Sequence, residues 1–114
     1  HNKAVKSIAW SSNGKLLASA SIDKTVKLWN VETGAEIPGL SVFNEAAEVV
    51  TFSQNGRMIA AGSADQTIKI WDTESKRQIK VLTDAGNRIT ALAFSPDGLF
   101  LASGSTDNSV KIWE

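Results

Sequence analysis

The chain has 114 residues, which is enough for one modest hydrophobic core. Its twelve basic and twelve acidic side chains cancel, so no broad electric field attracts nucleic acid or anionic lipid. The sequence has no cysteine and no apolar stretch long enough to span a bilayer, which excludes disulfide frameworks, thiolate–zinc sites and membrane-spanning helices. We therefore expect no nucleic-acid partner, no membrane association and a cytoplasmic location.

In chain order, the elements predicted first are four short strands. Asn13-Gly14 follows the first of them, and this pair supplies the positive φ angles that a tight hairpin needs. Pro38 lies in the fourth and cannot donate to a ladder, so that strand should form the outer edge of its sheet. The predicted strands are Val5–Trp10, Leu16–Ser21, Thr25–Trp29 and Glu36–Leu40.

The same pattern recurs twice more along the chain. Gln78–Leu82 is predicted as the fourth strand of the second unit, and Ile89–Phe94 as the first strand of the third, before Pro96-Asp97-Gly98. No segment has a convincing helical period. The third unit stops at Glu114 before a fourth strand, so we expect an all-β fold of four-stranded antiparallel sheets with about 11 strands.

An exact step of 42 residues relates the three units, without insertion or deletion. Many residue types keep this step, and the clearest sets are Trp29, Trp71 and Trp113; Gly14, Gly56 and Gly98; Asp23, Asp65 and Asp107; and Lys27, Lys69 and Lys111. The alternation along each third strand directs Val26 and Leu28 to one face, and Lys27 and Trp29 to the other. A single sheet cannot cover both of its own faces, so neighbouring units must pack face to face.

The period, together with endings at Trp29-Asn30, Trp71-Asp72 and Trp113-Glu114, resembles the WD-repeat β-propellers. The resemblance covers essentially the whole chain. It implies three blades, at residues 1–42, 43–84 and 85–114, with the last lacking its outer strand. All three would be part of one propeller domain.

The resemblance also implies a hydrogen-bonded His–Ser/Thr–Asp–Trp tetrad in each blade. His1, Ser19, Asp23 and Trp29 match it in the first blade. The second keeps Asp65 and Trp71 but has Phe43 and Ala61 at the other two positions, and the third keeps Ser103, Asp107 and Trp113 with Ala85 in the His place. Because a buried polar group without a partner is costly, the second blade is predicted to be the least rigid unless other groups substitute.

The residues favour structural over chemical roles. His1 is the only histidine and has no cysteine or second histidine nearby to share a metal. Asp23, Asp65 and Asp107 recur once per blade, so they do not converge on one substrate bond as catalytic carboxylates must. We expect no catalytic residue, no metal and no cofactor, and therefore no enzyme.

The resemblance points to a partner-binding surface instead. In such propellers three positions per blade face the partner, two early in the first strand and one before the turn Asp. They correspond here to Ala4, Lys6 and Ile22, to Ala46, Glu48 and Ala64, and to Arg88, Thr90 and Thr106. A merely solvated rim is the alternative for most of them. The expected function is a scaffold that presents Lys6, Ile22, Glu48, Arg88, Thr90 and Thr106 to a protein or peptide.

Three blades are too few for a closed propeller, which usually has about 4–8. We therefore expect either self-association, with two chains giving six blades, or further blades in a longer chain from which this piece, beginning at His1 rather than Met, was cut. The alternative function is a fragment of a repeat protein that has no ligand of its own and self-assembles into a closed propeller.

Overall fold

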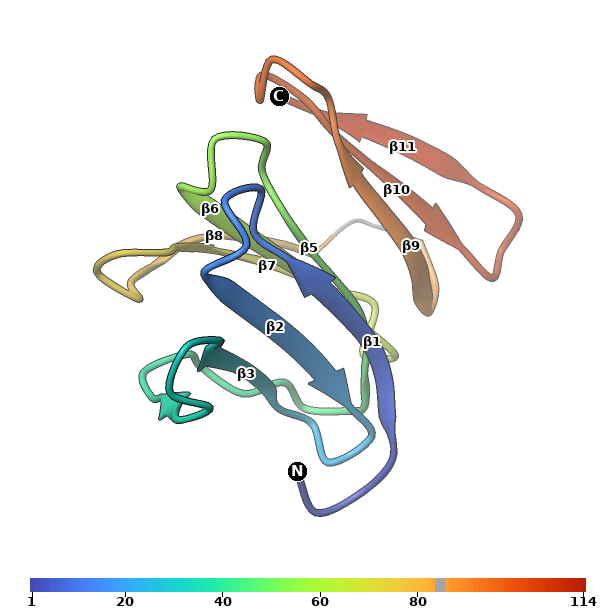
Figure 1. Ribbon diagram of the computed structural model, residues 1–114. Coiled ribbons are helices and arrows are strands. Elements are labelled where there is room, and N and C mark those ends of the chain that lie inside the picture. The colour runs from blue at the N-terminus through green and yellow to red at the C-terminus, as the bar shows by residue number, and fades with distance from the viewer. Residues whose placement is uncertain (84–85) are drawn as a thin grey trace.

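The computed structural model describes residues 1–83 and 86–114 (Figure 1). Within them it contains eleven strands and no helix, and therefore no helix with the length and apolar character needed to cross a membrane. The strands are β1 (Val5–Trp10), β2 (Leu16–Ser21), β3 (Val26–Asn30), β4 (Glu36–Ile37), β5 (Ala47–Phe52), β6 (Met58–Ser63), β7 (Ile68–Asp72), β8 (Gln78–Leu82), β9 (Ile89–Phe94), β10 (Leu101–Ser105) and β11 (Val110–Trp113).

The strands form three antiparallel sheets, each joining consecutive strands of the chain. β1–β4 and β5–β8 are four-stranded sheets in sequence order, and β9–β11 is three-stranded. The sheet of β5–β8 lies between the other two, with β5 in contact with both β1 and β9 (Figure 1). The all-β class and the blade-like antiparallel sheets predicted from the repeat are thus confirmed.

Two turn types connect the first three strands of each sheet. The first hairpin passes through glycine in the left-handed region, with φ of 72° at Gly14, and the Ser11 hydroxyl accepts the Leu16 N–H. The second hairpin uses non-glycine residues there: Lys24, Gln66 and Asn108 have φ angles of 76°, 74° and 71°. The sequence marks the first turn clearly by its glycine. The second turn is marked only by the Asp that precedes the residue with positive φ.

The fourth strand of the first unit is shorter than predicted. β4 ends at Ile37, not at Leu40, because Pro38 has no N–H to continue the ladder and Gly39 then takes a φ of 126°. β4 is nevertheless the outer strand of its sheet, next to β3 alone. β3 itself is shifted by one residue, to Val26–Asn30 from the predicted Thr25–Trp29.

The hydrophobic core consists of two layers between the three sheets. Ala18, Ala20 and Leu28 of the first sheet pack with Phe52 and Trp71 of the second. A second layer joins the opposite face of the middle sheet to the third sheet through Ile68, Ile70, Ile89 and Leu101. The middle sheet is therefore covered on both faces, as a central blade should be.

Candidate functional site: the rim of bulged strands

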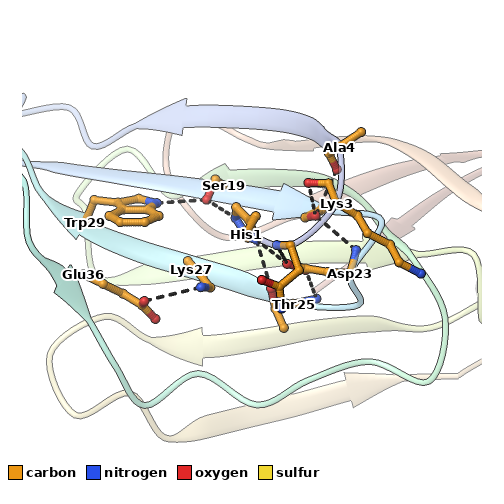
Figure 2. Close-up of polar contacts among 11 residues, drawn as sticks. His1, Lys3, Ala4, Ser19, Asp23, Thr25, Lys27, Trp29 and Glu36 are labelled. Carbon is orange, nitrogen blue, oxygen red and sulfur yellow. Dashed lines mark hydrogen bonds and ion pairs between the residues drawn. The ribbon is translucent and has the colours of Figure 1, made fainter.

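The first sheet carries a continuous polar network (Figure 2). His1 Nε2 lies 2.6 Å from Ser19 Oγ, and the Trp29 indole N–H donates to the same hydroxyl at 2.9 Å. His1 Nδ1 lies 3.0 Å from Asp23 Oδ2 and 3.1 Å from Thr25 Oγ1. The four side chains that the family resemblance implies as a tetrad therefore meet in one hydrogen-bonded cluster, which joins the segment before β1 to β2 and β3.

Asp23 is held as a carboxylate by this network. Burial raises its pKa, but hydrogen bonds from the Thr25 hydroxyl and from the Asn2 and Thr25 backbone N–H groups outweigh burial, and the net pKa is lowered. An acceptor that stays ionised can hold several donors at once. Asp23 therefore orders its turn and has no free proton for acid–base chemistry near neutral pH.

The second sheet satisfies its tryptophan from outside the tetrad positions. Trp71 is fully buried, and its indole N–H donates to Ser41 Oγ at 3.0 Å rather than to residue 61, which is alanine. Phe43 stands in the His position with its ring edge-on to Trp71 at 6.2 Å, and the Lys69 ammonium lies 4.9 Å from its centre. The expectation of a loose second blade rested on polar groups that Phe43 and Ala61 leave without partners. Trp71 has a partner in Ser41, so this reason does not apply to Trp71, and the rigidity of the blade stays a prediction.

The third sheet has part of the network. The Trp113 indole N–H donates to Ser103 Oγ at 3.1 Å, and the Ser109 N–H and hydroxyl both donate to the Asp107 carboxylate. Ala85, expected at the His position, lies outside the described residues. Asp107 resembles Asp65, whose carboxylate accepts the Thr67 N–H at 3.0 Å, since both belong to the turn after the second strand.

The expected partner-binding residues lie at a single structural feature, a β-bulge in the first strand of each sheet. The registers skip one residue between Val5 and Ser7 and between Ala47 and Val49. The same shift separates Gly104 from Ser105 on the strand opposite β9. The extra residues are Lys6, Glu48 and Thr90. A bulge redirects its side chain away from the regular sheet alternation.

Backbone hydrogen bonds hold the other expected residues beside these bulges. The N–H of Ile22 donates to Ala4 O at 3.0 Å, that of Ala64 to Ala46 O at 2.9 Å, and that of Thr106 to Arg88 O at 3.0 Å. Each sheet thus brings its three positions together at one end. We call these nine positions the bulge rim: Ala4, Lys6, Ile22, Ala46, Glu48, Ala64, Arg88, Thr90 and Thr106.

Charges on the bulge rim are unevenly exposed. The Glu48 carboxylate lies 4.0 Å from the Lys6 ammonium and 3.6 Å from the Arg88 guanidinium, so it links all three sheets. Its side chain is 10% exposed, against 44% for Lys6 and 55% for Arg88. The Lys6–Glu48 pair fits the repeat register. The Arg88 contact does not, because Arg88 is two residues before the matching position, and sequence spacing carries no signal for it.

The described residues contain no group of three or more His, Asp or Glu side chains that could hold a metal ion. The three turn aspartates lie in three different sheets, and each accepts hydrogen bonds within its own turn. The three carboxylates therefore order the turns that carry Ile22, Ala64 and Thr106.

Comparison with known proteins agrees with this architecture. The sequence profile of the WD40 family, described as WD domain, G-beta repeat, matches residues 1–30, 46–72 and 76–114. THO complex subunit 3 of Arabidopsis thaliana is 56% identical over 32 residues, which cover 28% of this chain and 10% of that protein. Protein Mut11 of Chlamydomonas reinhardtii is 51% identical over 37 residues, covering 32% of this chain and 10% of that protein.

A third relative is the probable cytosolic iron-sulfur protein assembly protein 1 of Malassezia globosa. It is 59% identical over 29 residues, which cover 25% of this chain and 8% of that protein. In all three cases the matched region is at most 10% of the relative's own length.

Proposed function

The chain belongs to the WD40 family, whose members are in general non-enzymatic protein-interaction modules, and from this premise we propose that it is a scaffold whose bulge rim binds a protein or peptide. The observation that supports this most is the arrangement of Lys6, Glu48 and Thr90, which are all bulge residues. Bulges placed at the same position in three sheets display side chains on a rigid support. Binding at such a rim needs no movement of the sheets.

The names of two relatives are consistent with a role in assemblies. One is called a subunit of the THO complex, and another is called a cytosolic iron-sulfur protein assembly protein. The second name also supports the further proposal that this chain acts in the cytoplasm. The identity of the partner does not follow from these names, because the shared region is short.

We assign different roles to the rim residues. Ile22, Thr90 and Thr106 are exposed and would contact the partner directly. Arg88 combines an exposed guanidinium with a nearby carboxylate that positions it, and arginine is enriched among residues that dominate interface energetics. Because the rim hides Glu48 and exposes the two cations beside it, we propose that the partner offers an acidic group together with an apolar one.

A peptide-display selection against the 114-residue chain tests this proposal. Peptides recovered with the chain are measured again against a rim variant, Ile22→Asp with Arg88→Glu. A matched control carries Val31→Asp with Arg57→Glu, because Val31 is as exposed as Ile22 (39% against 38%) but lies beyond the opposite ends of the strands. We expect the rim variant to bind at least about tenfold more weakly, the size of one good contact, and the control to bind as the original.

An equal loss in both variants would place binding elsewhere on the molecule. Retention in the rim variant would contradict the role of the rim.

A further inference from the structure

Each sheet has two chemically different faces. The tryptophan face of the first sheet carries Trp10, Leu17 and Trp29, which are opposite one another in the ladder, and Ile8, which is opposite Ser19. The alanine face carries Ala9, Ala18, Ala20, Val26 and Leu28. In both internal layers of the core, the alanine face of one sheet packs on the tryptophan face of the next. The chain therefore contains the same face-to-face contact twice.

One face of each kind has no cover among the described residues: the tryptophan face of the first sheet and the alanine face of the third. Residues at equivalent repeat positions show how much a neighbouring sheet reduces the exposed fraction of a side chain. Trp10 is 58% exposed, whereas Phe52, its equivalent in the covered second sheet, is 8% exposed. On the alanine face Ile112 is 71% exposed, whereas its equivalents Leu28 and Ile70 are 0% and 8% exposed. Both open faces thus present side chains of the type that is buried elsewhere in the chain.

The open alanine face also has a receptor for an aromatic side chain. An apolar hollow of about 440 Å³ is lined by Ala93, Phe94, Ser95, Phe100, Ala102 and Ile112. Four of these residues are 84 positions after Ala9, Leu16, Ala18 and Leu28, which pack in the core layer containing Phe52 and Trp71. Trp10 is 42 residues before Phe52 and is therefore its equivalent. Phe52 is buried against the alanine face of the first sheet, whereas Trp10 lies on the open tryptophan face.

We propose that a second copy of this chain covers these faces. The alanine face of one copy's third sheet packs on the tryptophan face of the other copy's first sheet, and Trp10 enters the hollow beside Ile112. The contact repeats in the reverse direction, so two copies close a ring of six sheets with two identical interfaces. Six is within the usual range of about 4–8 blades, whereas three copies would give nine. This association uses surfaces separate from the bulge rim and does not depend on a partner there.

Light scattering on a sizing column, over a range of concentrations, gives the first readout. We expect the mass of two chains of 12.2 kDa each. Trp10→Asp and Ile112→Asp should each weaken association by about 30-fold or more, the effect of losing one hot-spot contact. Val81→Asp, an exposed apolar residue on the outer strand β8 of the middle sheet, should leave the mass unchanged. Trp10 and Ile112 are exposed, so circular dichroism of the two variants should match that of the original chain.

Mixing the two variants checks the head-to-tail geometry. Each variant keeps one intact face, so a mixture regains one of the two interfaces and associates more tightly than either variant alone. An interface between identical faces would not recover on mixing.

A cysteine pair gives an independent readout, since the chain has no cysteine. The Val50 N–H donates to Ser7 Oγ at 3.2 Å across the first core layer, so Ser7→Cys with Val50→Cys reports a disulfide within one chain. The equivalent pair across the proposed interface is Ala91→Cys with Ile8→Cys. We expect the first pair to yield oxidised single chains and the second to yield covalent two-chain species.

A mass of one chain at every concentration would overturn the proposal. A growing series of masses would overturn the closed ring. A two-chain mass that Trp10→Asp and Ile112→Asp leave unchanged would show that copies associate through other surfaces, and would overturn it equally.

Discussion

A buried indole N–H needs an acceptor, and Trp71 obtains one from Ser41, a residue of the segment that leads into its sheet. Ser41 itself donates to Gln78 Oε1 at 2.9 Å, so the hydroxyl is fixed between two partners. The repeat pattern could not reveal this contact. In the first and third sheets the acceptor is Ser19 or Ser103, at the position that Ala61 occupies here. Sequence comparison of units identifies a missing group, but it does not locate a substitute at another position.

Ser41→Ala should destabilise the chain by about 1–3 kcal/mol, because Trp71 is fully buried and its N–H would lose this acceptor. Chemical denaturation measures the change in the free energy of unfolding. Adding Ala61→Ser to this variant restores an acceptor at the tetrad position and should recover part of the loss. An unchanged midpoint in the single variant would show that the bond contributes nothing.

Gly62 is a second residue with a specific packing role. A Cβ at this position would lie 2.4 Å from Ile89 Cγ2, and Ile89 is itself fully buried in the layer between the second and third sheets. We expect Gly62→Ala to cost about 1–3 kcal/mol through overpacking. Gly104→Ala is the matched control, because its nearest neighbour would be 3.4 Å away. Equal costs for the two substitutions, measured by thermal unfolding, would contradict the packing argument.

At the level of elements, the turns carry ionised aspartates that give the chain an acid limit. The Ser109 hydroxyl and N–H lower the pKa of Asp107, and the Ser95 hydroxyl and Leu99 N–H lower that of Asp97, from the ordinary 3.8. A lowered folded pKa gives stability that is complete above the ordinary value and is lost as the pH falls through the folded one. The free energy of unfolding should therefore decrease below about pH 4.

Urea denaturation at a series of pH values measures this acid limb. Asp107→Asn cannot titrate and should flatten it, whereas Lys15→Gln, as a control, should leave its slope unchanged. An identical slope in Asp107→Asn would contradict a contribution from that turn.

The strands should differ in protection against hydrogen exchange. β6 is the most enclosed strand, with Ile59 to Ser63 all buried, whereas β1 and β11 each have one uncovered face. Amides of β6 should exchange most slowly and those of β11 fastest, measured below the concentration at which copies associate. Faster exchange in β6 than in β2 would restore the expectation of a loose second sheet, which rested on Phe43 and Ala61.

Strand positions were largely predictable because turn chemistry and alternation are local properties. Val5–Trp10, Leu16–Ser21, Gln78–Leu82 and Ile89–Phe94 have the predicted bounds. The error at Pro38 has a local cause as well. Proline was expected within a longer edge strand that ends at Leu40, but because Pro38 has no N–H the ladder ends three residues earlier, at Ile37.

At the level of the whole molecule, Glu48 connects the three sheets through Lys6 and Arg88. We expect Glu48→Gln to reduce the free energy of unfolding by about 0.5–1 kcal/mol, since both partners are largely exposed. Added salt should reduce the difference between the two proteins. Urea denaturation at low and high salt measures it, and a difference that does not depend on salt would indicate lost packing instead. The order of the sheets was predictable from the 42-residue step, but this three-sheet bridge depends on bulge geometry.

The Ser41–Trp71 contact also has a genetic consequence. Units of equal length invite unequal recombination, which duplicates or deletes whole repeats without a frameshift. The first and third units would tolerate a new neighbour, because Ser19 and Ser103 supply the acceptor from within. The second unit borrows its acceptor from its predecessor, so a lineage could relocate it only behind a unit with a hydroxyl at that position. Ser41 and Thr83 both meet this condition, so tandem duplication of the second unit would keep an acceptor for its tryptophan, whereas its transfer behind a unit without such a hydroxyl would lose it.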